Sequence, residues 1–279
     1  METMQLCMNE VTIAKQGTLI DHIEACAANG ITEMEIRKPF LLEHLRRGGS
    51  LEEVKAALER CGVKPVCLNS IESITFNNKR GMRVLTEMSE YLFYCCRAIG
   101  CDCVEVIASF KVPAEDEKEI HTETVRALQQ LSDAAKPYGV KLALEYMGLP
   151  VSSVKTFNQA LAIVNEVERE NVGILLDTWH HYAGGSGTDD ILKADRGQIF
   201  IVHTSDCPRR EPLAALRPES FMPGDGVVEI GAMLENLKKV GYNGPVSVEV
   251  MAPEIQAMPT QQLFELAVQT TRPLLDALN

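Results

Sequence analysis

The chain has 279 residues, of which 46% are hydrophobic, and it carries a formal net charge of −12. This negative charge would repel a nucleic acid, and we find no dense Lys/Arg cluster beyond Arg209-Arg210 that would override it. The chain contains no run of about 18 apolar residues and no signal-peptide pattern at its amino-terminus. We therefore expect a cytoplasmic protein that binds neither nucleic acid nor membranes.

Short apolar runs alternate with longer amphipathic segments from one end of the chain to the other, without linkers or low-complexity stretches. The predicted strands are Gln5–Asn9, Met34–Arg37, Pro65–Asn69, Cys103–Ala108, Lys141–Tyr146, Val172–Thr178, Ile199–Ser205 and Pro245–Val250. The predicted helices are Leu19–Ala28, Leu51–Cys61, Met82–Ile99, Glu119–Pro137, Thr156–Glu168, Ile230–Val240 and Gln261–Leu278. This alternation predicts an α/β protein, a single (β/α)₈ TIM barrel domain over residues 1–279.

An open, doubly wound sheet is the competing fold. It usually carries a Gly-rich phosphate turn after its first strand, and the segment Asn9-Glu10-Val11-Thr12 is not such a turn. The nine cysteines form no CxxC pair and lie in apolar surroundings, so we interpret them as reduced packing residues. Cys101 and Cys103 are expected to lie on one face of a strand as core filler.

Four predicted strands in the second half of the chain end in a residue that can bind a metal ion: Glu145, Asp177, His203 and Glu249. Because side chains alternate along a strand, these four are expected to point into the barrel, three of them beside small neighbours. Larger apolar residues occupy the opposite faces and suit packing against helices: Leu142, Leu144, Ile174, Leu176, Phe200, Val202, Val246 and Val248. The four side chains should meet at the carboxyl-terminal mouth, where barrel enzymes place their active sites.

Any one of these carboxylates alone could be a buried, hydrogen-bonded residue. Three of them together would repel each other and would have to take up protons unless a cation lay between them. The sequence therefore predicts one divalent metal ion. Three oxygen ligands and one nitrogen ligand suit Mn²⁺, Zn²⁺ or Co²⁺, and ligand type does not separate these ions further.

A metal ion at a barrel mouth can bind the ketone oxygen and a neighbouring hydroxyl of a small polyhydroxylated carbonyl compound. It favours removal of the proton on the adjacent carbon and stabilises the enediolate that forms. Glu145 and Glu249 come from well-separated strands, so one can remove a proton and the other can return it. The pattern indicates an isomerase or epimerase that needs no organic cofactor.

Other polar residues near the predicted strand ends are candidates for supporting roles. His180 could orient the substrate or carry a proton, and a loop histidine is the alternative. Glu35, Arg37 and Asn69 end earlier strands at the same rim and could bind hydroxyl groups, although Glu35 and Arg37 could instead form an ion pair that braces the barrel. Trp179 could form an apolar wall for the substrate, although such a residue more often packs in the core.

These residues resemble the xylose isomerase-like barrel superfamily of sugar isomerases and epimerases, to which endonuclease IV is related. The resemblance covers essentially the whole chain and includes the stretches CMNEVT, EMEIRK, PYGVKLALEYMG and NVGILLDTWHHYAGG. It implies metal binding by Glu145, Asp177, His203 and Glu249, and glutamate-assisted proton transfer through an enediol. It also implies a keto-inositol or keto-sugar as the substrate and a place in carbohydrate or inositol catabolism.

The loop ahead of the PGDG turn departs from the family pattern. Close relatives carry an Asp-Arg pair there, where this chain has Glu219-Ser220. Because that loop covers the active site in such barrels, the substrate can differ while the metal chemistry is retained. Arg217 is the arginine that we expect to reach the same space.

Three other functions compete with an isomerase. A metal-dependent dehydratase of an inosose or dehydroshikimate-like compound needs a proton donor aimed at a leaving hydroxyl, and a non-catalytic sugar-binding barrel would bind without turnover. Endonuclease activity on abasic DNA is disfavoured by the acidic charge and by the missing His ligands of a three-metal cluster. A homodimer is compatible with the sequence, although nothing in it identifies an interface.

Overall fold

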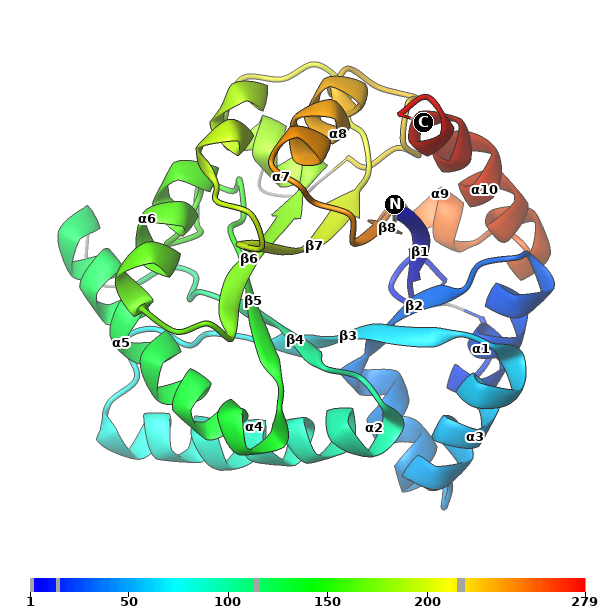
Figure 1. Cartoon of the computed structure of the whole chain (residues 1–279), viewed down its shortest axis with the longest axis horizontal. Coiled ribbons are helices and arrows are strands. Elements are labelled where there is room, and N and C mark those ends of the chain that lie inside the picture. The colour runs from blue at the N-terminus through cyan, green and yellow to red at the C-terminus, as the bar shows by residue number, and fades with distance from the viewer. Residues whose placement is uncertain (1–2, 14–15, 113–115, 215–218, 279) are drawn as a thin grey trace.

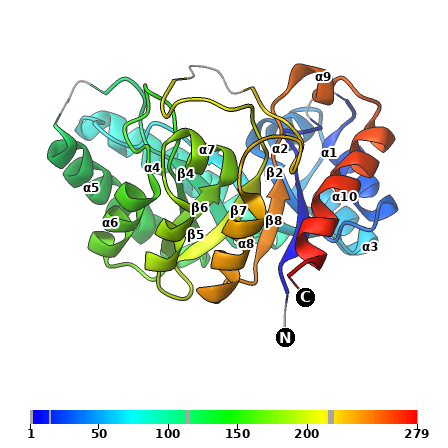
Figure 2. The same cartoon turned by 90° about the horizontal axis from the view of Figure 1, so that it is seen from above.

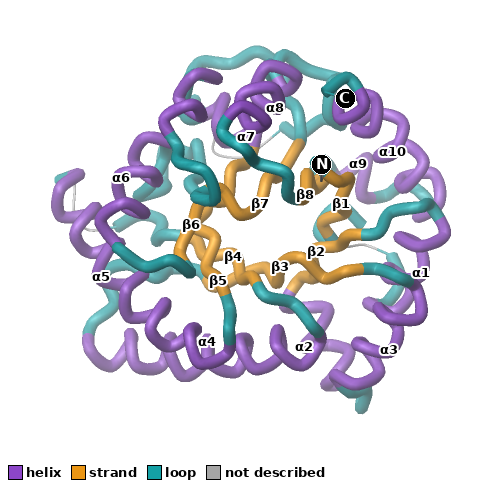
Figure 3. Tube along the Cα trace, in the orientation of Figure 1, coloured by secondary structure: helices purple, strands orange, loops and turns teal. Residues whose placement is uncertain are grey.

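Eight parallel strands form a closed ring in which each strand pairs with the next one along the chain and β8 pairs with β1. The computed structural model describes residues 3–13, 16–112, 116–214 and 219–278. Figure 1 looks along the barrel, and Figure 3 shows the strands as an inner ring with the helices outside it. The predicted fold class, a single (β/α)₈ barrel, is confirmed.

The strands begin within one residue of where the sequence predicts them. They are β1 (Gln5–Asn9), β2 (Glu33–Arg37), β3 (Lys64–Ile71), β4 (Cys103–Ile107), β5 (Lys141–Glu145), β6 (Val172–Asp177), β7 (Ile199–Thr204) and β8 (Pro245–Val248). The predicted end of β8 at Val250 is wrong by two residues. The strand ladder ends there because the amide of Val250 donates to the side chain of Thr12 rather than to a neighbouring strand.

Helices connect the strands on the outside of the ring. They are α1 (Leu19–Ala28), α2 (Lys38–Arg46), α3 (Leu51–Cys61), α4 (Lys79–Ile99), α5 (Glu117–Ala135), α6 (Phe157–Val167), α7 (Thr178–Ala183), α8 (Ile230–Lys239), α9 (Pro253–Gln256) and α10 (Thr260–Asp276), with 3₁₀ turns at Lys136–Tyr138 and Thr188–Lys193. The sequence analysis did not predict α2, α7, α9 or the 3₁₀ turns. These are short segments, and the hydrophobic periodicity that identifies a helix needs a longer window.

Two apolar clusters lie on the two sides of the strand ring. The outer cluster packs the strands against the helices, and it contains seven of the eight residues predicted for the outward faces. The small inner cluster fills the barrel below its mouth with Cys7, Val66, Cys67, Cys103, Ala143, Leu175 and Ile201. The exception is Phe200, which packs against the inner cluster, so its predicted outward position is wrong. The register between β6 and β7 shifts between Ile174 and Leu175, and the absence of a side chain on Gly173 leaves room for the ring.

All nine cysteines lie in the described part of the chain as free thiols, and eight of them are buried. Their interpretation as packing residues agrees with this burial. The prediction that Cys101 and Cys103 share one face is wrong, because β4 begins only at Cys103. Cys103 points into the inner cluster, whereas Cys101 belongs to the outer one.

Both termini lie at the lower edge of the view in Figure 2, on the side where the strands begin. The carboxyl-terminal ends of the strands therefore face the opposite side of the molecule, the side of the connections from each strand to the next helix. No helix among the described residues combines the length and the apolar character needed to cross a membrane.

Candidate metal centre

Four side chains converge at the carboxyl-terminal mouth of the barrel: those of Glu145, Asp177, His203 and Glu249. Each offers one ligand atom, and these atoms all lie within 4.8 Å of one another. Glu145 and Asp177 are the last residues of β5 and β6, His203 is the penultimate residue of β7, and Glu249 directly follows β8. Consecutive strand ends of a parallel barrel thus bring together residues that are up to 104 positions apart in the sequence.

Carboxylates lie on both sides of the His203 ring. Its Nε2 atom lies 3.0 and 3.1 Å from the two carboxylate oxygens of Glu35, which is fully buried in the middle of β2. Its Nδ1 atom lies 2.9 Å from Glu249 Oε2 and 3.7 Å from Glu145 Oε1. Nδ1 therefore faces the carboxylates while Nε2 faces Glu35. A histidine that ligates a metal commonly donates its second ring N–H to a carboxylate in this manner.

Asp177 also uses its two carboxylate oxygens differently. Oδ1 accepts a hydrogen bond of 2.7 Å from the backbone N–H of His180, because Asp177 is the N-cap residue of α7. This contact leaves Oδ2 available to bind a metal ion. A carboxylate at a helix amino-terminus is stabilised by the unpaired N–H groups of the first turn, so the short helix α7 fixes the orientation of Asp177.

The charges of the cluster suit a cation. Burial, together with the carboxylates of Glu249 and Glu145, raises the pKa of Asp177 well above its usual range. Burial alone would lower the pKa of His203, but the carboxylates of Glu249 and Glu35 outweigh it and raise that pKa well above 6.5. The cluster thus balances part of its negative charge by holding protons in the protein interior. A divalent cation can take the place of these protons, so the residues present fit a metal ion.

Glu105 is a buried carboxyl group of this site that the sequence analysis missed. It lies on β4, one strand away from Glu145, and burial and the charge of Glu145 raise its pKa well above the usual range. Its position could have been predicted, because it shares the inward face of its strand with Cys103. Only the cysteines of this strand were considered in the sequence analysis.

The remaining predicted site residues lie in different surroundings. His180 and Asn69 are buried, and within the described structure the Nδ1 atom of His180 and both polar side-chain atoms of Asn69 have no hydrogen-bond partner. The side chain of Arg37 is 25% exposed and lies 4.0 Å from Glu249 Oε1. The ion pair between Glu35 and Arg37, the alternative to hydroxyl binding, is not formed between these described residues; Glu35 instead contacts His203. Arg217 lies outside the described residues.

Trp179 packs between the site and the connection from β7 to α8. Its ring meets that of His180 edge to face at 4.9 Å, and the guanidinium of Arg210 lies 5.0 Å from its ring centroid on another side. Its Nε1 atom donates a 2.9 Å hydrogen bond to the backbone oxygen of Glu219. Trp179 therefore joins the loop that departs from the family pattern to His180, which lies beside the candidate metal ligands.

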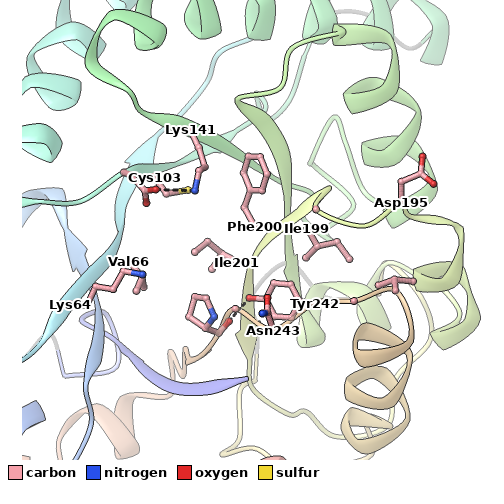
Figure 4. A pocket seen from close by; sticks show the side chains of 16 residues that line it. Lys64, Val66, Cys103, Lys141, Asp195, Ile199, Phe200, Ile201, Tyr242 and Asn243 are labelled. Carbon is pink, nitrogen blue, oxygen red and sulfur yellow. Dashed lines mark hydrogen bonds and ion pairs between the residues drawn. The ribbon is translucent and has the colours of Figure 1, made fainter. Parts of the chain in front are cut away.

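A hollow of about 410 Å³ lies at the opposite, amino-terminal end of the barrel (Figure 4). Phe200, Ile201 and Tyr242 are among the side chains that line it, and Lys141 forms a 2.8 Å ion pair with Asp102 at its edge. The inner apolar cluster lies between this hollow and the metal ligands. We therefore place the candidate active site at the mouth and not here.

A closed parallel barrel with three carboxylates and one histidine at its mouth defines a metal-binding (β/α)₈ protein. The chain matches the xylose isomerase-like TIM barrel family over residues 23–272. It is 35% identical to the inosose isomerase of Bacillus licheniformis over 96% of each chain. It is 25% identical to the 3-dehydroshikimate dehydratase of Pseudomonas aeruginosa, over 90% of this chain and 39% of that protein.

Among solved structures, the chain is similar to the IOLI protein with a bound zinc atom. The two share 31% sequence identity with a TM-score of 0.94, over 99% of each chain. The chain therefore belongs to the xylose isomerase-like TIM barrel family.

Proposed function

We propose that this protein is a divalent-metal-dependent isomerase or epimerase of a keto-inositol or keto-sugar, with an inosose as the first substrate to test. The observation that carries the proposal is the convergence of Glu145, Asp177, His203 and Glu249 within 4.8 Å at the barrel mouth. The similarity to inosose isomerases over 96% of the chain supports the reaction class and the substrate.

The donor set of three carboxylates and one imidazole suits Mn²⁺, Zn²⁺ or Co²⁺, and the zinc atom in the similar IOLI structure supports Zn²⁺ as the first ion to test. When bound, the ion supplies the positive charge that holds a ketone and an adjacent hydroxyl and stabilises negative charge that develops on them. Asp177 Oδ2 and His203 Nδ1 are the ligand atoms that their other contacts leave available.

Glu145 and Glu249 carry out the proton transfers in this proposal. They lie on β5 and after β8, three strands apart in the ring, so their carboxylates can reach a bound substrate from different directions. One removes the proton from the carbon beside the carbonyl, and the other returns a proton to the resulting enediolate at the neighbouring carbon or on the opposite face. Because each glutamate is both a ligand and a proton carrier, removing either charge should stop the reaction.

His180, Arg37 and Asn69 are the proposed substrate-binding residues. Burial lowers the pKa of His180, so its imidazole is neutral at physiological pH and can donate or accept a hydrogen bond. Asn69 offers a donor and an acceptor that are buried and unpartnered within the described structure. Unpaired polar atoms in a buried position are costly, and the hydroxyl groups of a polyol would satisfy them. Trp179 contributes an apolar surface beside His180.

The direct test replaces each glutamate by its uncharged counterpart. Glu145→Gln and Glu249→Gln should each reduce turnover of an inosose by at least about 10³-fold, whereas the matched control Glu235→Gln on the exposed side of α8 should leave it unchanged. The assay follows conversion to a new isomer in zinc-loaded enzyme by chromatography. Near-normal turnover in both variants would remove the mechanism.

A dehydratase is the second candidate, because the chain is also similar to a 3-dehydroshikimate dehydratase over 90% of its length. A dehydratase produces a conjugated enone, which absorbs ultraviolet light, whereas an isomerase does not. Absorbance during turnover therefore separates the two reactions. Substrate binding without any turnover would favour the third candidate, a sugar-binding barrel. The homodimer and the cytoplasmic location stay predictions.

A further inference from the structure

The segment Asn9-Glu10-Val11-Thr12 begins at the last residue of β1 and contacts Glu249 and its two chain neighbours through side chains that the proposed function does not use. Asn9 is fully buried, and its Nδ2 atom donates a 3.1 Å hydrogen bond to Glu249 Oε1. Its Oδ1 atom accepts a 3.0 Å hydrogen bond from the backbone N–H of Val11. This second contact fixes the amide orientation, because a flipped amide would place its NH₂ group against the N–H of Val11.

Thr12 holds the backbone on both sides of Glu249. Its hydroxyl donates a 2.9 Å hydrogen bond to the carbonyl of Val248 and accepts one of 2.9 Å from the N–H of Val250. The β8 ladder ends at Val248, so these two backbone groups are satisfied by one side chain instead of by a neighbouring strand. Thr12 is fully buried.

The segment itself is anchored independently of the metal ligands. The buried carboxylate of Glu10 accepts a 2.8 Å hydrogen bond from the backbone N–H of Arg37 and lies 2.7 Å from His22 Nδ1. From the other side, Gln256 of α9 donates a 2.8 Å hydrogen bond to the carbonyl of Val11. Contacts with β2, α1 and α9 thus fix residues 9–12 beside Glu249.

We infer that Asn9 and Thr12 are positioning residues for Glu249, an inference that rests on the proposed metal site. Asn9 occupies Oε1 and so leaves Oε2, which lies 2.9 Å from His203 Nδ1, as the oxygen for the metal ion. Thr12 fixes the backbone from which this carboxylate extends. Neither residue needs to contact the substrate. Both restrict the orientations of the Glu249 side chain, which lies beyond the end of β8.

The test measures zinc affinity of the metal-free protein by competition with a chelator, without substrate, and then kcat and KM of the zinc-loaded enzyme. Asn9→Ala, Asn9→Asp and Thr12→Val should each weaken zinc binding about 10- to 100-fold and lower kcat more than they raise KM. Thr12→Ser keeps the hydroxyl and should restore wild-type values. Thr124→Val is the matched control, because Thr124 is a buried threonine that donates to a backbone carbonyl within α5.

Wild-type zinc affinity in Asn9→Ala and Thr12→Val would overturn the inference, and so would a loss no larger than that in Thr124→Val. If Thr12→Val does not fold, the two Asn9 variants decide the outcome, since Asn9→Asp keeps the size and the acceptor for Val11. The zinc measurement uses no substrate. A failure of the proposed isomerase reaction would therefore leave this result standing, and the two failures can be distinguished.

Discussion

Glu35 illustrates how a single carboxylate acquires its role from the closure of the barrel. From the sequence it is a candidate for binding substrate hydroxyls at the end of β2. In the structure its side chain is fully buried, and it meets His203 Nε2 on the side of the imidazole away from the other ligands. Such a carboxylate sets the tautomer of the histidine and raises its basicity as a ligand. We therefore expect Glu35 to affect metal binding rather than substrate binding.

Glu35→Gln should weaken zinc binding by about 10- to 100-fold, because a neutral amide is a weaker acceptor for the imidazole N–H. KM of the fully zinc-loaded enzyme should stay near the wild-type value. Chelator competition and steady-state kinetics measure the two quantities. Glu33→Gln, two residues earlier on the same strand, is the matched control. A raised KM with unchanged zinc affinity would instead support direct binding of the substrate.

The convergence of Glu145, Asp177, His203 and Glu249 could be predicted from the sequence because each one lies at or directly after the end of a strand, and parallel strands of a barrel end at the same mouth. The contacts of Asn9 and Glu35 could not be predicted from the sequence. Asn9 lies 240 positions from Glu249, and Glu35 lies 168 positions from His203. Which partner each side chain finds depends on strand register and on the pairing of β1 with β8, and neither is encoded in a local pattern.

At the scale of elements, Asp206 organises the connection between β7 and α8. Its Oδ1 atom accepts hydrogen bonds of 2.8 and 2.9 Å from the N–H groups of Cys207 and Val228, and its Oδ2 atom accepts one of 3.2 Å from Gly224. A Cβ atom on Gly226 would lie only 2.3 Å from Asp206 Oδ1. The turn written PGDG in the sequence is therefore folded around one buried carboxylate.

Asp206→Ala should lower the free energy of unfolding by about 3 kcal/mol, because it leaves three backbone N–H groups without their acceptor. It should also lower kcat/KM, since this connection carries the Glu219 carbonyl that holds Trp179. Urea unfolding and steady-state kinetics provide the two values. Asp225→Ala, at an exposed position of the same turn, is the control. Equal stability of Asp206→Ala and the control would show that the carboxylate does not organise the loop.

The packing of Phe200 inside the barrel leads to a second prediction for the elements. A Cβ atom on Gly173 would lie 2.7 Å from the Phe200 ring and 2.7 Å from the carbonyl oxygen of Gln198. Gly173→Ala should therefore destabilise the protein by about 1–3 kcal/mol through overpacking. Gly231→Ala in α8 meets no atom within 4 Å and should be neutral or stabilising, because alanine favours a helix. A neutral Gly173→Ala would contradict the packing described for β6 and β7.

For the whole molecule, we expect the candidate metal centre to couple pH to stability. Burial and neighbouring carboxylates raise the pKa of Asp177, and the carboxylates around His203 raise its pKa in spite of burial. For both groups the folded protein binds a proton more tightly than the unfolded chain. The stability that they contribute is therefore lost as pH rises through their folded-state pKa values, and for His203 the loss begins above about 6.5.

The Tm of the metal-free protein should accordingly fall between about pH 6 and about pH 8.5. Zinc competes with these protons, so its affinity and the rise in Tm that it causes should both be larger at the higher pH. Thermal unfolding with and without zinc at the two pH values measures both the Tm of the metal-free protein and the rise in Tm that zinc causes. His203→Asn should reduce the pH effect. A zinc effect that is the same at both pH values would contradict the assignment of these protons to the metal centre.

In the proposed reaction, Glu145 and Glu249 move protons at the carbon beside a ketone with the help of the metal ion. The most direct measurement incubates the zinc-loaded protein with 2-keto-myo-inositol in heavy water and follows deuterium by NMR. We expect deuterium at that carbon and a new isomer, both of which disappear on chelation and in Glu145→Gln. A new isomer formed without any deuterium incorporation, or exchange that persists after the metal is removed, would contradict it.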